Sequence, residues 1–213
     1  MRKESEPKRI VEQGYNCIAG QHLAWAQTVR SEERARYTAV LLEKLSPGAS
    51  VLELGCGAGV PTTQQLAQRF RVTGVDISAQ QVALARQHVP EADFIQADMT
   101  QLDFTPASFD GVAAFYSIIH VPRDEQPELF QKIASWLRPD GLLVATMGAH
   151  PMKAEYDDDF LGTTMHWSSF DSETNQHIVE QAGLRITNAR LETEKEFDQP
   201  VTFLWVIARK PTQ

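Results

Sequence analysis

Short apolar segments alternate with helical segments through the middle of the chain, and this alternation restricts the possible folds more than any other feature. The expected strands and the helices between them cover residues 50–54, 62–70, 70–75, 78–89, 92–96, 109–115, 124–137 and 141–147. Near-continuous apolar strands separated by helices are typical of a parallel sheet covered on both faces. We therefore predict a three-layer α/β fold.

The end of the chain departs from this pattern. Residues 172–184 predict a last helix, and residues 186–194 and 201–209 alternate apolar and polar side chains as strands do. Too few residues join these two strands for a helical crossover, so we expect them to pair antiparallel. The sequence thus predicts about seven strands, with an antiparallel last strand.

Two other segments stand apart from the alternation. Residues 1–47 carry apolar side chains at helical spacing before a Ser-Pro-Gly break, and we expect them to form an N-terminal helical cap or lid. Residues 150–171 show no clear period and are expected to form an irregular substrate loop. Because we find neither a repeat nor a second core, we predict one domain over residues 1–213, with its α/β core over residues 48–213.

Charge and cysteine content exclude some classes of protein. The 213 residues include 20 basic and 28 acidic side chains, a net charge of −8, which argues against nucleic acid as the main partner. Two cysteines cannot form a disulfide framework. The charged N-terminal segment lacks the apolar stretch of a secretory signal, and no apolar run reaches the ~20 residues of a membrane span. We therefore expect a cytoplasmic protein.

The most informative motif is VLELGCGAG, residues 51–59. In it a strand runs into Gly55, Gly57 and Gly59, and a helix is expected from about Thr62. Glycine is needed where the chain turns tightly and where the backbone must approach a ligand closely. A plain strand-to-helix turn needs only one glycine, so three of them favour a ligand-binding turn.

Two kinds of nucleotide site do not fit this motif. A dinucleotide fingerprint G-x-G-x-x-G would require its third glycine at the position of Val60. About fifty residues also precede this strand, whereas a dehydrogenase usually starts almost at once. A phosphate-binding loop is excluded because no Gly-Lys-Ser/Thr follows. An oxidoreductase is therefore a disfavoured reading.

With Glu53 ahead of the glycines, the motif resembles acidic-x-Gly-x-Gly-x-Gly, the first motif of class I S-adenosylmethionine-dependent methyltransferases. Other pieces resembling that family follow in order: Asp76 in GVDIS, Asp98 and Met99 in QADMTQLDF, then FDGVAAFYSIIHVP and LRPDGLLVATMG. The resemblance runs from about Tyr15 to the final strand. It implies a Rossmann-like fold and S-adenosylmethionine as cofactor.

The resemblance also implies roles for individual residues. Glu53 and the backbone of Gly55 would face the methionyl part of the cofactor, and Asp76 would accept both ribose hydroxyl protons. Asp98 would receive the adenine amino group, and Met99 would offer its backbone amide to the ring. Asp76 as a helix cap and Asp98 in an Asx-turn are the alternatives. The expected cofactor-binding residues are Glu53, Gly55, Cys56, Gly57, Gly59, Asp76, Ile77, Asp98, Met99 and Tyr116.

His120 is the best candidate for a group that handles a proton. It ends the fourth strand segment, at the carboxyl edge where open α/β sheets bind ligands. Either it acts as a general base, or it orients the cofactor or a neighbouring side chain. Tyr116 and Ser117 are expected at the same edge.

Other aromatic residues are candidates for binding the methyl acceptor. Tyr15 lies in YNCIAGQHLAW, which resembles a Tyr-Asp-x-Ile-Ala motif whose tyrosine lies on a lid helix in small-molecule methyltransferases. We therefore place Tyr15 with His120 in the catalytic site, the alternative being a surface tyrosine. Tyr156, His166 and Trp167 are expected to line a substrate wall, although Trp167 is equally compatible with the core. The run of three aspartates at 157–159 is expected to be solvated, and we expect no metal.

These observations favour methyl transfer from S-adenosylmethionine to an oxygen, nitrogen or carbon of a small molecule. An RNA or protein methyltransferase is the second reading, against which stand the missing Asn/Asp-Pro-Pro-Tyr/Phe motif and the lack of a basic tract. A non-catalytic S-adenosylmethionine-binding protein is the third. We expect a monomer or homodimer that binds neither nucleic acid nor membranes.

Overall fold

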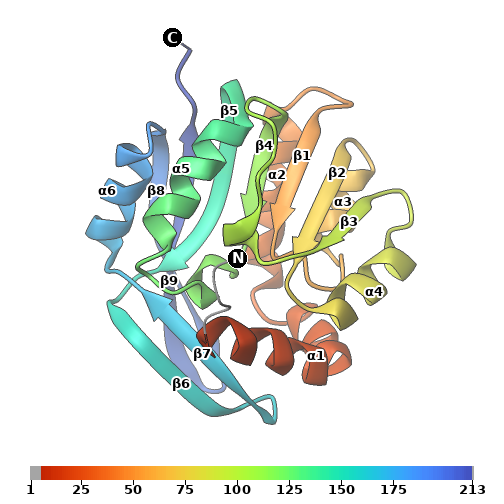
Figure 1. The fold of residues 1–213 in the computed structure, drawn as a ribbon, viewed down its shortest axis with the longest axis vertical. Coiled ribbons are helices and arrows are strands. Elements are labelled where there is room, and N and C mark those ends of the chain that lie inside the picture. The colour runs from red at the N-terminus through yellow and green to blue at the C-terminus, as the bar shows by residue number, and fades with distance from the viewer. Residues whose placement is uncertain (1–5, 213) are drawn as a thin grey trace.

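A seven-stranded sheet forms the centre of the molecule, in the order β3-β2-β1-β4-β5-β9-β8 (Figure 1). The structure is a computed structural model, and it describes residues 6–212. Five strands run parallel: β1 (Ser50–Leu54), β2 (Arg71–Asp76), β3 (Asp93–Gln96), β4 (Phe109–Ala114) and β5 (Leu137–Gly148). The predicted parallel α/β sheet is confirmed. Its central strands are apolar because both faces are covered.

Helices pack on both faces of this sheet. On one face α5 (Gln126–Trp136) and α6 (Ser172–Gln181) cover a core that includes Leu52 and Leu54. On the other face α2 (Ser31–Lys44) and α3 (Thr62–Ala67) pack over Val51. Alternate residues of β1 thus face opposite cores, as the pleat of a strand requires. The helix α4 (Ala79–His88) packs beside β2 and β3.

The last two strands form a long hairpin. Strand β8 (Arg185–Glu196) pairs antiparallel with β9 (Gln199–Arg209), and β9 pairs antiparallel with β5. Phe197 and Asp198 make the connecting turn, both with positive φ. The antiparallel last strand predicted from the alternation is confirmed.

The N-terminal part of the chain is helical, as predicted. Helix α1 (Glu6–Ala26) lies across the carboxyl edge of the parallel strands and packs on β7 and α4 (Figure 1). Residues 1–5 of the expected cap lie outside the described part of the chain. None of the helices within residues 6–212 combines the length and apolarity that crossing a membrane requires.

The prediction of an irregular segment at residues 150–171 is wrong. These residues form a separate hairpin of β6 (Met152–Phe160) and β7 (Thr163–Ser169). Strand β6 shows no apolar alternation because almost all of its side chains are exposed, while β7 is buried against α1. The hairpin extends below the main sheet and faces α1 (Figure 1).

Candidate functional site

The glycine turn after β1 explains why glycine recurs at every second position. Gly55, Gly57 and Gly59 have φ values of 76°, 53° and 78°, a region that side chains disfavour. A Cβ on Gly55 would lie 2.2 Å from Cβ of Ser117. A Cβ added to Gly57 would have no atom nearer than 3.9 Å, so the space beside this glycine is open toward the pocket.

Gly59 has a different position from the other two glycines. It does not line the pocket, and a Cβ there would approach Ala85 and Val89 at 3.2–3.4 Å. Gly59 therefore lets the turn pack closely on α4. The structure gives this third glycine a packing role.

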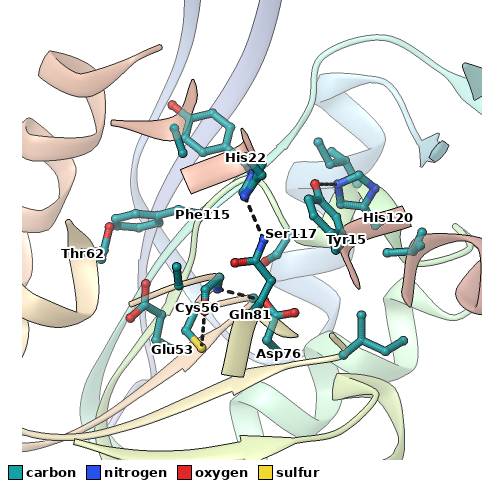
Figure 2. Close-up of a pocket in the computed structure, with 18 of the residues that line it drawn as sticks. Tyr15, His22, Glu53, Cys56, Thr62, Asp76, Gln81, Phe115, Ser117 and His120 are labelled. Carbon is teal, nitrogen blue, oxygen red and sulfur yellow. Dashed lines mark hydrogen bonds between the residues drawn. The ribbon is translucent and has the colours of Figure 1, made fainter. Parts of the chain in front are cut away.

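One pocket at the carboxyl edge of the sheet gathers most of the predicted site residues (Figure 2). Helix α1 and the β6–β7 hairpin contribute to its wall through Tyr15 and Trp167. The sequence-predicted residues that line it are Tyr15, Glu53, Gly55, Cys56, Gly57, Asp76, Ile77, Asp98, Met99, Tyr116, Ser117, His120 and Trp167. Residues far apart in the chain are therefore brought together as the motifs predicted.

Asp76 ends β2 and holds the glycine turn. Its carboxylate accepts hydrogen bonds from the backbone N–H of Gly57 at 2.8 Å and of Ser78 at 2.9 Å. Burial raises the pKa of Asp76 to about 6, and the hydrogen bonds oppose that rise. The helix cap itself comes from Ser78, whose hydroxyl accepts from the N–H of Gln81. Capping therefore does not account for Asp76.

Glu53 lies on the other side of the glycine turn from Asp76, with Cys56 between them (Figure 2). One of its oxygens accepts a hydrogen bond from the Thr63 hydroxyl at 2.5 Å. Burial raises the pKa of Glu53 to about 8, although the Thr63 bond and the charge of Arg34 lower it. Glu53 thus keeps its proton to a higher pH than an exposed glutamate does.

Asp98 forms an ion pair with Lys8, a residue that the sequence analysis did not identify as part of the site. Its carboxylate accepts from the Thr100 backbone N–H at 2.9 Å, so the Asx-turn alternative is present. The other oxygen lies 2.8 Å from Nζ of Lys8, which is buried in α1 and also pairs with Glu125 at 2.5 Å. Lys8 therefore ties α1 to the loop expected to receive adenine.

His120 has a defined tautomer because of its two partners. Its Nδ1 lies 2.8 Å from the backbone oxygen of His166, which can only accept, so Nδ1 carries the proton. Nε2 must then accept from the hydroxyl of Tyr15, 2.8 Å away (Figure 2). Burial lowers the pKa of His120 to about 4 and raises that of Tyr15. At neutral pH both groups are uncharged.

The hairpin places its three predicted substrate residues differently. Trp167 lines the pocket, with its ring 4.4 Å from that of His120. His166 is buried and Tyr156 is half exposed, and neither lines the pocket. His166 contributes to the site only through its backbone oxygen, which accepts a hydrogen bond from Nδ1 of His120. The aspartates 157–159 lie exposed along β6.

Several pocket residues were missed by sequence reasoning. Gln81 is buried, donates from Nε2 to Nδ1 of His22 at 3.1 Å, and keeps its Oε1 without a partner among the described residues. Arg30 and Arg34 also line the pocket although both belong to the charged helical segment. Charge in an amphipathic helix predicts exposure, so the sequence carried no signal for their burial.

Comparison with known proteins supports this description of the fold. Residues 51–141 match a methyltransferase domain family. The O-methyltransferase cnsE of Penicillium expansum is 34% identical over 160 residues, which are 67% of this chain and 55% of that protein. A trans-aconitate 2-methyltransferase of Delftia acidovorans is 36% identical over 137 residues, 59% of this chain and 48% of that protein.

A solved structure extends the similarity to the whole chain. The 1,6-didemethyltoxoflavin-N1-methyltransferase of Burkholderia thailandensis superposes with a TM-score of 0.72 at 19% identity, covering 100% of this chain and 93% of its own. The fold and the glycine turn thus define an α/β protein of the class I methyltransferase type. Residues 51–141 thus match a methyltransferase domain, and the chain is similar in sequence and in fold to S-adenosylmethionine-dependent methyltransferases. It spans about half the length of the curated relatives it matches.

Proposed function

We propose that the protein transfers a methyl group from S-adenosylmethionine to an oxygen, nitrogen or carbon nucleophile of a small molecule. One observation carries the proposal: the glycine turn, Asp76 and the Asp98–Met99 segment all line one pocket that α1 helps to enclose. Two of the proteins named above, the trans-aconitate and the 1,6-didemethyltoxoflavin methyltransferases, are named for small-molecule acceptors, which supports this class of acceptor.

The residues present fit the cofactor. The open space beside Gly57 leaves room for a ligand to approach the backbone closely. The buried Oε1 of Gln81, which has no partner among the described residues, can accept a hydrogen bond from a ligand. When bound, S-adenosylmethionine supplies an activated methyl group on a sulfonium centre. We assign Asp76 to the ribose hydroxyls and Glu53 to the methionyl end. Asp98 and Met99 are assigned to the adenine ring.

For the acceptor, the Tyr15–His120 pair provides a hydrogen bond of fixed direction. The single hydroxyl proton of Tyr15 is committed to Nε2 of His120, so the Tyr15 oxygen can only accept from a further group. This favours an acceptor that carries an O–H or N–H. His120 therefore acts chiefly by orienting Tyr15, and with a pKa near 4 it is a weak base at neutral pH.

The enclosed site disfavours a macromolecular acceptor. Tyr15 and Trp25 of α1 and Phe160 and Trp167 of the hairpin surround the pocket with rings, and the chain has a net charge of −8. The sequence has no basic tract to bind an RNA backbone, and the pocket cations Lys8 and Arg30 are paired with carboxylates of the chain. Shielding by α1 suits a reaction that must exclude water and align a small acceptor.

The decisive experiment follows a methyl label. A metabolite extract is incubated with the protein and methyl-labelled S-adenosylmethionine, and the products are analysed by mass spectrometry. We expect label on a small molecule. Label found on RNA or protein would favour the second reading, and cofactor binding without transfer of label to any acceptor would favour a non-catalytic binding protein.

A further inference from the structure

The tip of the β8–β9 hairpin projects beyond the main sheet. Strand β5 pairs with β9 only as far as Phe203, whereas the pairing of β8 with β9 continues to Glu196 and Gln199. The tip therefore extends past β5, towards the β6–β7 hairpin (Figure 1). Glu196 lines the pocket, and its charge, after burial and the charge of Asp76, raises the pKa of Tyr15. The tip thus lies on the side of the pocket where Tyr15 lies.

A buried ion pair holds the tip in this place. Arg30 is only 3% exposed, and its Nε donates to the carboxylate of Glu196. Its Nη2 donates to the backbone oxygen of Val201 at 2.6 Å, and its Nη1 donates to Glu33 of α2 at 2.9 Å. Burying a charge is costly unless its donors are bonded, and here all three nitrogens have an acceptor. The projecting tip is therefore fixed against α2 by charged hydrogen bonds.

Phe197 occupies a turn position to which its side chain is poorly suited. Phe197 and Asp198 form the two-residue turn with φ values of 47° and 63°, a geometry that favours Asn-Gly. The side chain of Phe197 is also 61% exposed. Neither backbone preference nor burial accounts for a phenylalanine here. Residues held at positive φ cluster at functional sites, so this position calls for a role in the pocket beside it.

The ring of Phe197 extends a row of rings that begins inside the pocket. It lies nearly parallel to Trp25, at 6.1 Å between ring centres, and edge-on to Phe160 at 6.2 Å. Phe160 packs edge-on against Trp167 at 5.2 Å, and Trp167 lies 4.4 Å from the ring of His120. Trp25, Phe160 and Trp167 line the pocket, and Phe197 lies at the outer end of the row. We call Trp25, Phe160, Trp167 and Phe197 the aromatic rim.

The part of the pocket assigned to the cofactor has a different lining. It consists of the glycine turn, the carboxylates of Asp76 and Asp98, and the aliphatic side chain of Ile77. The aromatic rim offers ring faces and edges, which prefer to pack on another aromatic ring in stacked or edge-on geometry. The oxygen of Tyr15, which can accept a hydrogen bond, lies at the inner end of the rim beside His120. The two parts of the pocket therefore suit two different ligands.

We propose that the methyl acceptor is an aromatic small molecule that binds along the aromatic rim, with Phe197 covering its outer end and its O–H or N–H directed at the oxygen of Tyr15. The inference rests on the proposed function and names the acceptor class that the proposed function leaves open. A flat ring suits this site because it can contact several rings of the rim at once. A saturated acceptor would bury apolar area there without the ring–ring contacts.

The first arm of the test identifies the methylated product. A metabolite extract is incubated with the wild type and methyl-labelled S-adenosylmethionine, and the main labelled small molecule is characterised by mass spectrometry and ultraviolet absorbance. We expect it to contain an aromatic ring. A labelled product without one would overturn the inference and leave the proposed function standing. The absence of any labelled small molecule would instead overturn the proposed function.

The second arm tests Phe197 with three variants. Phe197→Asn removes the ring and introduces a residue that tolerates a positive φ, and Phe197→Tyr keeps the ring. Leu191→Thr is the matched control, because Leu191 lies on β8, is 57% exposed and does not line the pocket. Three quantities are measured: the amount of extract that half-saturates label transfer, the affinity for S-adenosylhomocysteine, and the Tm.

In Phe197→Asn the half-saturating amount of extract should rise about 3- to 10-fold, the change that losing a ring–ring contact predicts. Its maximal rate and its affinity for S-adenosylhomocysteine should stay unchanged, and its Tm should not fall, because asparagine relieves the backbone strain. Phe197→Tyr and Leu191→Thr should match the wild type in the half-saturating amount.

Other outcomes of the second arm exclude Phe197 from the acceptor site. An unchanged half-saturating amount in Phe197→Asn, or an equal rise in Leu191→Thr, would show that the ring does not contact the acceptor. A lower Tm together with weaker binding of S-adenosylhomocysteine, or failure of Phe197→Asn to fold, would show a structural role only. The product found in the first arm still tests the acceptor class in that case.

Discussion

The hydroxyl oxygen of Tyr15 lies 2.8 Å from Nε2 of His120, a contact between residues 105 positions apart in the chain. It joins helix α1 to the segment that follows β4 at the carboxyl edge of the sheet. The backbone oxygen of His166 fixes the ring from its other side at 2.8 Å. Helix α1 and the β6–β7 hairpin therefore both contact the imidazole of His120 at the edge of the sheet.

This contact predicts how the two residues contribute to turnover. Tyr15→Phe should lower kcat by about 10²-fold, because the acceptor loses the oxygen that orients it, while the affinity for S-adenosylhomocysteine stays unchanged. Tyr15→Ala should lower kcat further, since the ring also closes the pocket. His120→Ala should resemble Tyr15→Phe at every pH. Steady-state rates across pH measure this, and a His120→Ala defect confined to neutral pH would instead identify His120 as a general base.

The cofactor assignment predicts selective stabilisation. S-adenosylhomocysteine at ~100 times its dissociation constant should raise the free energy of unfolding by ~2.7 kcal/mol, because it binds only the folded state. NAD should have no effect. Thermal unfolding with each compound measures both, and stabilisation by NAD alone would contradict the assignment.

Asp76 should matter for binding and for folding. Asp76→Ala should weaken binding of S-adenosylhomocysteine by about 2–3 kcal/mol through the lost ribose contacts. It should also lower the free energy of unfolding by about 1–3 kcal/mol, because the N–H groups of Gly57 and Ser78 lose their acceptor. Ser78→Ala is the control, since it removes the hydroxyl that caps α4 and leaves the Asp76 carboxylate in place. Unchanged affinity in Asp76→Ala would assign Asp76 to the turn alone.

Gly48, which precedes β1, and Gly55 of the glycine turn both have positive φ but predict different effects of substitution by alanine. Gly48→Ala should cost only the strain of a positive φ, about 1 kcal/mol, since no atom lies within 4 Å of the added Cβ. Gly55→Ala should cost clearly more, because its Cβ would lie 2.2 Å from that of Ser117. Urea unfolding of both variants measures the difference. Equal losses would mean that β1 and the Ser117 segment shift apart freely.

Glu53 predicts an unusual pH dependence of stability. Its pKa is about 8 in the folded protein, against an ordinary value of 4.5, so the folded state holds the proton more tightly than the unfolded chain does. Its contribution to stability is therefore complete below pH 4.5 and is lost as the pH rises towards 8. Glu53→Gln removes this dependence.

The stability of Glu53→Gln relative to the wild type should accordingly rise over that pH range. Each unit of pKa displacement corresponds to about 1.4 kcal/mol. Urea unfolding of both proteins without ligand, at pH 5 and pH 8, measures the change. A constant difference at the two pH values would show that Glu53 is ionised throughout.

Local sequence patterns determined most of the secondary structure and the order in which strands and helices follow one another along the chain. The apolar strands, the glycines with positive φ and the acidic residues at the ends of β1 and β2 follow short-range rules, which act within a few residues. The part of the pocket that we assign to the cofactor was predictable for this reason. The hairpin at residues 150–171 was not, because β6 has no buried face to impose a period.

Tertiary structure alone decided the partners of the charged and polar side chains. Nothing in the helical pattern of α1 and α2 indicates that Lys8 pairs with Asp98, or that Arg34 is buried beside the pocket without a carboxylate. Such pairings depend on where chain segments far apart in sequence cross in space. Burial then sets the pKa values of Glu53 and His120, because desolvation acts only once the fold excludes water.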